Sequence, residues 1–260
     1  MSEAPAPELA SLRATNDLAL ALLRETGKLG GDILDLGAGG GFLARALSAE
    51  RSRLGIKPGK RLQACDIDGA RFSAEGVEFK RCDVNDGLPY PDGVFDAVVA
   101  IEVMEHTRAP YDVLADIARV LKPGGALIFS VPNVGHALSR LMFLASGHYQ
   151  MFPSPSTQPE NAGRLCGHLA PLPYQYWHFG LRRAGFSQIA LHSDRAKKSA
   201  TALALLLWPW LEFARVMHLY RLARHDPPLY AETKDIARAA NSWTVLTSRS
   251  LVFLALKAAS

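Results

Sequence analysis

The fold is decided by a short apolar strand that runs into a glycine-rich turn, Ile33-Leu-Asp-Leu-Gly-Ala-Gly-Gly-Gly-Phe42. A strand that passes through glycines into a helix brings free backbone N–H groups close to a ligand. The spacing is Asp-x-Gly-x-Gly-x-Gly, which differs from the Gly-x-Gly-x-x-Gly of dinucleotide sites. The acid at the end of the strand would repel a pyrophosphate, so the turn favours a cationic ligand.

Apolar runs and helical stretches alternate on both sides of this turn. A helix with leucines at helical spacing is predicted over 9–25, and a second helix over 111–121 ends at the turn-forming sequence Lys122-Pro-Gly-Gly125. Further strands are predicted at 61–65, 77–81, 95–101 and 126–131. This alternation predicts a parallel sheet between two layers of helices.

Composition bounds the class of protein. The chain has 260 residues, 48% hydrophobic and 21% charged, which is typical of one globular core and excludes a disordered chain. The net charge of +4 permits anionic partners without requiring nucleic acid. Cys65, Cys82 and Cys166 form no CxxC pair, and the first eight residues lack a basic region followed by an apolar core. We therefore expect reduced thiols and a cytoplasmic protein.

The pattern changes after Pro132. A helix is predicted over 134–145, a Pro-rich loop over 153–171, and another helix over 174–184. Strands are predicted at 186–191 and 250–257, with an apolar and basic helical insertion at 197–248 between them. No repeat or linker is visible, so a single domain over 1–260 is expected.

Three acids end three successive predicted strands. Asp35 precedes the glycine turn, Asp66 follows the second strand, and Asp83 follows the third. A single acid at such a position is most often a surface residue or a helix cap. Three of them at the same edge of a parallel sheet indicate a binding site, and Asp66 stands where a carboxylate would accept ribose hydroxyls.

Residues 32–133 resemble the core of a class I S-adenosylmethionine-dependent methyltransferase. The matching segments are 33–42, Cys65-Asp-Ile-Asp68, Cys82-Asp-Val84, 88–96, Glu102-Val-Met-Glu-His106 and Leu121-Lys-Pro-Gly-Gly125. The resemblance implies a Rossmann-like α/β fold, with a mostly parallel seven-stranded sheet, helices on both faces and an antiparallel last strand. It also implies S-adenosylmethionine as the cofactor and S-adenosylhomocysteine as the product.

The resemblance assigns the cofactor-binding residues. The methionine end would be held by Asp35, Gly37, Ala38 and Gly39. Asp66 would bind the ribose hydroxyls and Asp83 the adenine amino group, with Ile67 and Val84 against the adenine ring. The two cysteines that precede Asp66 and Asp83 should point away from the site into packing, by strand alternation.

Residues 131–185 resemble methyltransferases associated with bacterial surface-glycan synthesis and, more distantly, the ubiquinone-pathway O-methyltransferases. Val131-Pro-Asn-Val-Gly-His136 and Leu181-Arg-Arg-Ala-Gly-Phe186 carry this resemblance. It implies that the segment 133–173 covers the substrate and sets selectivity. The resemblance predicts O-methylation of a small or lipid-linked acceptor such as a glycan or quinone intermediate.

The sequence Glu102-Val-Met-Glu-His106 has two interpretations. Small-RNA 3′-end 2′-O-methyltransferases hold a divalent ion with a similar cluster, which makes Glu102, Glu105, His106 and His168 candidate metal ligands suited to Mn²⁺ or Zn²⁺. The same motif also occurs in metal-independent members, where it packs beside the cofactor. In that case His106, with Glu102 beside it, is the candidate general base for an acceptor hydroxyl.

The insertion contains a run of thirteen uncharged residues, 199–211, with Trp208 and Trp210. The run is shorter than the roughly 20 apolar residues that span a bilayer, and Pro209 should kink it. Residues 199–224, flanked by lysines and arginines, therefore predict contact with an anionic membrane, on its cytoplasmic face. A helix packed at the sheet edge and a dimer contact are alternatives.

Two other functions compete with this interpretation. A methyltransferase of 3′ nucleic-acid ends fits the Glu/His cluster, but the chain shows no basic stripe or RNA-binding module. A non-catalytic scaffold that keeps the fold is the second alternative, and the intact set of three acids argues against loss of cofactor binding. No Asn/Asp-Pro-Pro-Tyr tetrad follows the fourth strand, which disfavours transfer to a nucleobase nitrogen.

Overall fold

The computed structural model describes residues 7–56, 61–158 and 167–259. Its helices are α1 (Pro7–Glu25), α2 (Phe42–Arg53), α3 (Pro110–Val120), α4 (Ala137–Ser146), α5 (Tyr174–Arg183), α6 (Lys198–His225), α7 (Pro227–Ala239) and α8 (Trp243–Thr247). Its strands are β1 (Ile33–Leu36), β2 (Leu62–Asp66), β3 (Glu78–Arg81), β4 (Phe95–Ala100), β5 (Leu121–Pro132), β6 (Phe186–Ser193) and β7 (Ser250–Lys257). Two 3-10 turns, η1 (Val84–Asp86) and η2 (Met104–His106), follow β3 and β4.

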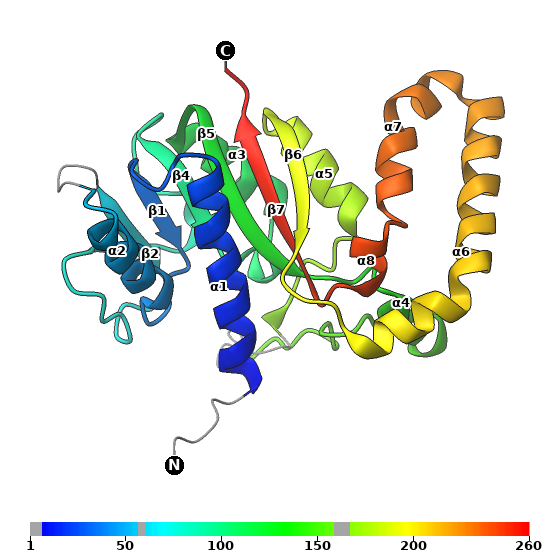
Figure 1. Ribbon diagram of the computed structural model, residues 1–260, viewed down its shortest axis with the longest axis horizontal. Coiled ribbons are helices and arrows are strands. Elements are labelled where there is room, and N and C mark those ends of the chain that lie inside the picture. The colour runs from blue at the N-terminus through cyan, green and yellow to red at the C-terminus, as the bar shows by residue number, and fades with distance from the viewer. Residues whose placement is uncertain (1–6, 57–60, 159–166, 260) are drawn as a thin grey trace. The chain divides into compact units, whose positions relative to one another are not determined.

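The strands form one seven-stranded sheet in the order β3-β2-β1-β4-β5-β7-β6 (Figure 1). The pairs β1–β2, β1–β4, β2–β3 and β4–β5 are parallel. At the two ends of the β6–β7 pair, the N–H of Arg249 donates to the carbonyl oxygen of Arg195, and the N–H of Ala258 donates to that of Gly185. Residue numbers therefore rise along β7 as they fall along β6, so these strands are antiparallel. The fold class expected from the sequence is confirmed. The strand order reverses between β1 and β4, and ligands bind at such a point in open α/β sheets.

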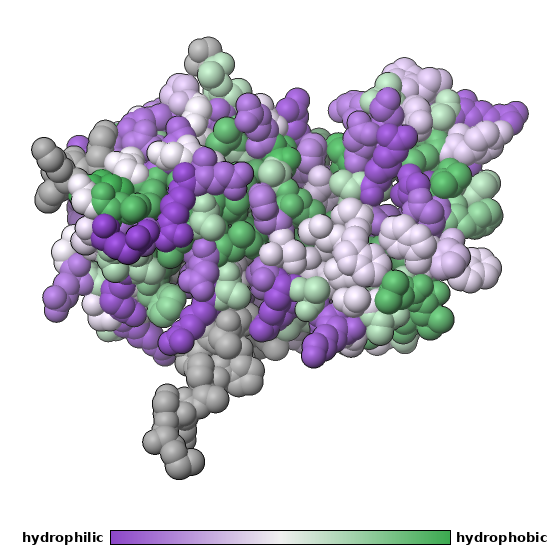
Figure 2. All heavy atoms as spheres, viewed as in Figure 1, coloured by the Kyte–Doolittle hydropathy of each residue, from purple (hydrophilic) through white to green (hydrophobic). Residues whose placement is uncertain are grey.

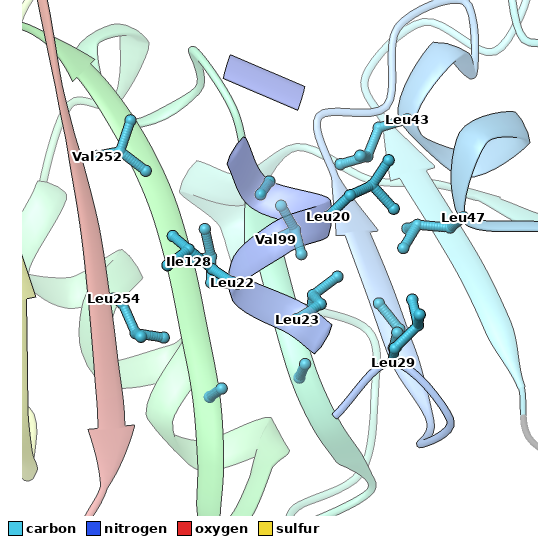
Figure 3. Packing of buried hydrophobic residues seen from close by; sticks show 14 residues of the cluster. Leu20, Leu22, Leu23, Leu29, Leu43, Leu47, Val99, Ile128, Val252 and Leu254 are labelled. Carbon is cyan, nitrogen blue, oxygen red and sulfur yellow. The ribbon is translucent and has the colours of Figure 1, made fainter. Parts of the chain in front are cut away.

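The sheet has helices on both faces because its central strands are buried on both sides. Leucines of α1 and α2 pack on one face against β1, β4, β5 and β7 (Figure 3). The labelled members of this core are Leu20, Leu22, Leu23, Leu29, Leu43, Leu47, Val99, Ile128, Val252 and Leu254. On the other face, the rings of Phe129 and Phe253 stack with centroids 4.8 Å apart. Helix α3 lies behind the sheet in Figure 1.

One predicted turn is part of a strand. Lys122-Pro-Gly-Gly125 was expected to separate α3 from β5, but β5 begins at Leu121, which pairs with Phe95. The next pair is Ala97 with Ala126, so residues 122–125 form a bulge. Pro123, which has no N–H to donate, and Gly124, which has a positive φ, both suit a bulge. These residues, which predict a turn, here interrupt the hydrogen bonding between β4 and β5.

The chain divides into two compact units. Unit 1 contains residues 1–131, 180–191 and 252–260, and unit 2 contains residues 132–179 and 192–251. Both the expected covering segment 133–173 and the insertion 197–248 fall in unit 2. Within unit 2, α6 contacts α4, α7 and α8.

The uncharged run of the insertion lies inside a longer helix than expected. Helix α6 has 28 residues, with Pro209 in its interior, and by length and composition alone it is sufficient to cross a membrane. The length limit predicted from residues 199–211 was therefore wrong, because the helix continues through the charged residues that follow. Figure 1 shows α6 bending between a shorter and a longer arm, as expected of a helix with an internal proline.

Candidate functional site

The glycine turn of unit 1 is held against the ends of two strands. The backbone N–H groups of Gly37 and Ala38 donate to the carbonyl oxygen of Cys65, at 2.8 and 3.1 Å. Gly37 has a φ of +74°, and a Cβ there would come within 2.2 Å of Cγ2 of Val103. A side chain at position 37 is therefore excluded by the segment that follows β4, so Gly37 is required by packing.

Gly39 has a different role in the same turn. Its φ is +50°, and a Cβ at this position would meet no atom within 4 Å. Its N–H donates to Oδ2 of Asp66 at 2.8 Å. The backbone of Gly39 is thus held by the Asp66 carboxylate, and no atom occupies the space where a Cβ would stand. A ligand therefore has room to approach this backbone closely.

Asp35 is a buried acid without a counter-ion in the described chain. It is 3% exposed, and its Oδ2 atom has no hydrogen-bond partner. Burial raises the pKa of Asp35 to about 7, against the opposing effect of the Ala44 N–H, and the nearby charge of Asp66 raises it further. A carboxylate held in this way gains most from a cation that enters the site.

The end of β2 supplies an acid and an apolar side chain. Asp66 also accepts the N–H of Asp68 through Oδ1, at 3.0 Å, so its carboxylate is oriented by the Gly39 and Asp68 N–H groups. A carboxylate oxygen accepts more than one hydrogen bond, so both oxygens retain capacity for hydroxyl groups. The next residue, Ile67, is 57% exposed, which is high for its type.

Asp83 caps the turn η1 that follows β3. Its Oδ1 accepts both the backbone N–H and the side-chain NH₂ of Asn85, each at 2.9 Å. The Asn85 Oδ1 atom accepts the N–H of Arg108 at 2.8 Å, which joins this turn to the segment after β4. Val84 between them is partly exposed. Asn85 was not singled out from the sequence, because its role depends on a contact 23 residues away.

The segment 102–106 starts with a strained residue. Glu102 has a φ of +55°, a conformation that favours glycine, and its N–H donates to Oγ of Ser130 at 3.0 Å. Such strain persists only where surrounding structure fixes it, and it often marks functional sites. His106 is half-buried at the end of η2. These residues belong to unit 1 and His168 to unit 2, so the predicted metal site stays a prediction.

Glu105 is buried in η2. It is 1% exposed, its Oε2 has no hydrogen-bond partner in the described chain, and burial raises its pKa to about 8. The raised pKa means that folding is most favourable with Glu105 protonated, so this contribution to stability is lost as pH rises from the unfolded value of 4.5 through about 8.

We expect Glu105→Gln to make stability less dependent on pH. The neutral amide is similar in shape to the protonated acid, so the variant should avoid a loss of a few kcal/mol that wild type suffers between about pH 5 and 9. Thermal unfolding across this range measures the effect, with the exposed Glu75→Gln as the control. Equal pH slopes for wild type and Glu105→Gln would contradict it.

The two described cysteines lie side by side beneath the acids. Cys65 and Cys82 are buried, and their Sγ atoms are 3.6 Å apart. Their predicted packing in the interior is therefore confirmed, and their orientation away from Asp66 and Asp83 stays a prediction. Cys166 lies outside the described residues.

In unit 2, His136 is buried at the start of α4. It is 3% exposed, and its Nδ1 accepts the N–H of Ser139 as the N-cap of α4. Burial and the charge of Lys197 lower its pKa to about 4, so the ring is neutral and can accept this bond. The sequence carried no sign of this, because histidine is an uncommon cap.

The chemistry of unit 1 defines the ligand that fits. A buried carboxylate calls for a cation, a second carboxylate at an open glycine suits a pair of hydroxyls, and an exposed isoleucine suits a flat apolar ring. These groups stand at the carboxyl ends of β1 and β2, where the strand order places a ligand. A phosphate-rich ligand does not fit beside two acids.

Comparison with known proteins supports the same region. Residues 34–129 match a family model described as a methyltransferase domain. The chain is 33% identical over 131 residues to a ubiquinone biosynthesis O-methyltransferase of Methylococcus capsulatus, and 36% identical over 132 residues to that of Nitrosococcus oceani. These matches cover 50% and 48% of this chain and 55% and 54% of the relatives, so the chain spans little more than half of their length.

Solved structures show a likeness of fold alone. A SAM-dependent methyltransferase from Archaeoglobus fulgidus superposes with a TM-score of 0.51 and 14% identity, covering 93% of this chain and 94% of the other. The cyclase SpnF superposes with a TM-score of 0.52 and 19% identity, covering 94% of this chain and 81% of its own. One fold therefore accompanies more than one reaction.

Proposed function

Since this chain belongs to the class I S-adenosylmethionine-dependent methyltransferases, we propose that it transfers a methyl group to an oxygen atom of a small or lipid-linked acceptor. The observation that carries the proposal is the buried Oδ2 of Asp35, which has no hydrogen-bond partner among the described residues, in the same glycine-rich segment as the open backbone of Gly39. The ammonium group at the amino-acid end of the cofactor would supply the positive counter-charge for the carboxylate of Asp35.

The remaining acceptors and apolar side chains of the site fit the rest of the cofactor. Asp66 would accept the two ribose hydroxyls while it keeps its bond to Gly39. Ile67 and Val84 would lie against the adenine ring, and Asp83 would accept from its amino group. Ala38 and Gly37 would hold the methionine end by close approach of their backbone. S-adenosylmethionine, when bound, supplies a methyl group on an already activated sulfonium.

The acceptor is best matched by a phenol. His106, supported by Glu102, would take the hydroxyl proton on an imidazole nitrogen, and a phenol with a pKa of about 10 gives up its proton far more readily than a sugar alcohol. The similar proteins named for ubiquinone biosynthesis favour the same choice. A quinone-pathway intermediate is therefore the first acceptor in this proposal, and a lipid-linked glycan is the second.

The proposed place of action is the cytoplasmic surface of a membrane, where a lipid-linked acceptor would be met. A methyl-transfer assay with labelled S-adenosylmethionine tests the function. Its acceptors are a catechol with a prenyl tail, a polyprenyl-linked sugar and an RNA oligonucleotide with a free 3′ end. Transfer to RNA alone would favour the nucleic-acid alternative, and cofactor binding without transfer to any of the three would favour the scaffold.

Asp66→Ala should weaken binding of S-adenosylhomocysteine by about tenfold or more, because two charge-assisted hydrogen bonds to the ribose are lost. Calorimetric titration measures the change. The control is Asp68→Ala, which removes an exposed acid two residues away. Titration with and without added Mn²⁺ also shows whether a metal contributes. Unchanged affinity in Asp66→Ala would contradict the ribose assignment.

A further inference from the structure

We infer that helix α6 docks the chain on an anionic membrane, with one apolar face in the headgroup region and the helix axis parallel to the surface. This inference rests on the proposed function for the acceptor and deepens it, because it names the surface on which a lipid-linked acceptor would be met. The structure describes every residue of α6 and α7 and of the segments that join them to β6 and β7.

One row of side chains along α6 is apolar and exposed. Its members recur every three or four residues, which places them on one face of a helix. We call them the α6 stripe: Ala202, Leu206, Trp210, Phe213, Met217 and Tyr220. Leu206 and Trp210 are each 74% exposed. Figure 2 shows apolar and pale side chains gathered over the lower part of α6.

The stripe is too large and too aromatic for an ordinary solvent-facing helix. The buried residues of α6 are Ala200, Ala204 and Leu219, and Leu203 and Leu211 pack partly buried against the same unit. The large side chains of the α6 stripe are outside this contact and face outward. Exposed apolar surface of this extent marks an interaction site in soluble proteins. Trp210 and Tyr220 are of the types that concentrate at membrane–water interfaces.

Both ends of the stripe are cationic. Lys198 lies one turn before Ala202 on the same row, and Arg224 lies one turn after Tyr220. Both are exposed, and the acid of this helix, Glu212, lies off the stripe and is paired with Arg215. Cations at the ends of an apolar row can reach anionic headgroups while the row itself enters the acyl boundary.

This charge pattern selects a lipid surface over a second copy of the chain. In an antiparallel pair of stripes, Lys198 of one helix would lie opposite Arg224 of the other. In a parallel pair, each cation would lie opposite its own equivalent. Both arrangements place like charges in contact, which opposes association. An anionic bilayer meets both cationic ends with opposite charge.

The topology of the chain favours a helix on the surface over a helix that crosses the bilayer. The strands before and after the insertion, β6 and β7, are neighbours in one sheet, so the chain must return to the side from which it left. The return helix α7 has 13 residues, about 20 Å by helical rise, and carries Glu232, Lys234, Asp235 and Arg238. A hydrocarbon core is about 30 Å thick, so α7 is too short and too charged to cross it.

Vesicle flotation tests the inference on the full chain. The vesicles contain phosphatidylcholine alone or mixed with phosphatidylglycerol. We expect wild type to float with the anionic vesicles and to be released by salt or by an alkaline wash. Trp210→Glu combined with Phe213→Glu should reduce binding by at least about tenfold. The matched control Leu54→Glu alters an exposed leucine of unit 1 and should bind as wild type does.

Replacing Lys198 and Arg224 by Gln should weaken binding to anionic vesicles by about fivefold per cation and leave any binding to neutral vesicles unchanged. Three results would overturn the inference: no flotation of wild type, equal flotation of the stripe variant, or resistance of wild type to the alkaline wash. If wild type is a dimer in solution and the variant with Trp210→Glu and Phe213→Glu is a monomer, the α6 stripe is a dimer contact instead. Titration of S-adenosylhomocysteine into the same samples is independent of lipid, so it separates failure here from failure of the proposed function.

Discussion

Asp35→Asn should weaken binding of S-adenosylhomocysteine by about a hundredfold at neutral pH, because the amide cannot neutralise the ligand's ammonium group in a buried site. The affinity of wild type should also depend on pH. Asp35 has a pKa of about 7 in the free protein, so below that value a proton must leave before the carboxylate can pair with the ammonium. We expect the dissociation constant to rise about tenfold for each pH unit below about 7.

The upper limit of this pH range is set by the ligand, whose α-amino group stands beside a carboxylate and therefore keeps its proton more than about one pH unit above the value of about 8 for a chain terminus. The strongest binding of wild type should therefore lie between about pH 7 and 9. Calorimetric titrations from about pH 5 to 9 measure the acid side and this optimum. On the acid side the Asp35→Asn variant should show a flat profile, and a profile parallel to that of wild type would contradict the role of Asp35.

Protein stability separates loss of binding from loss of folding in this variant. The pKa of Asp35 is raised from 3.8 to about 7, so its contribution to stability is present below the unfolded value and is lost as pH rises through the folded one. Above that range the buried charge costs up to about 4 kcal/mol of unfolding free energy. Asp35→Asn should therefore unfold at a higher temperature than ligand-free wild type at about pH 8, although it binds more weakly.

His106→Gln should lower the rate of methyl transfer by about 10²–10⁴-fold, the range by which a positioned general base accelerates proton transfer. Affinity for S-adenosylhomocysteine should stay within about twofold, because His106 follows β4, whereas the predicted cofactor ligands lie at the ends of β1 and β2, in the turns after them, and at η1. The rates of wild type and His106→Gln are measured at saturating cofactor, so that the effect of Asp35 protonation on cofactor affinity does not enter the comparison.

The matched control for this variant is His225→Gln, which alters an exposed histidine of unit 2 at the end of α6, outside the segment 133–173. It should turn over as wild type does. If His106→Gln also retains the wild-type rate, the proton leaves by another route and His106 is no catalytic residue. A rate that is lost together with affinity would place His106 in cofactor binding.

Local patterns were sufficient for much of the fold. β1 and β7 have the predicted bounds because each is an apolar run that ends at clear polar or glycine signals. The bulge at 122–125 was read as a turn, because a Pro-Gly-Gly sequence looks the same whether or not a neighbouring strand pairs with the residue before it. Register depends on the partner strand, and the partner is not visible in a local window.

The candidate site was predicted unevenly for the same reason. Asp35 and Asp66 were found because both stand at strand ends, where topology fixes the edge of the sheet. The link from Asp83 through Asn85 to Arg108 could not be found, because it depends on the folded approach of two turns. The strain at Glu102 is also a property of the packed chain, as is the absence of a hydrogen-bond partner for Oδ2 of Asp35 among the described residues.

The insertion between β6 and β7 bears on how the sheet is completed during folding. Two neighbouring strands are separated by residues 194–249, so their pairing closes a long loop, and each doubling of loop length costs about 0.6 kcal/mol of chain entropy. Contacts among α6, α7 and α8 shorten that loop once they form. The pairing of β1 with β4 also closes a long loop, residues 37–94, but that loop contains β2 and β3, which join the same sheet. The loop before β7 contains helices instead, so the rate at which the sheet acquires its last edge is governed by helices that lie outside the sheet.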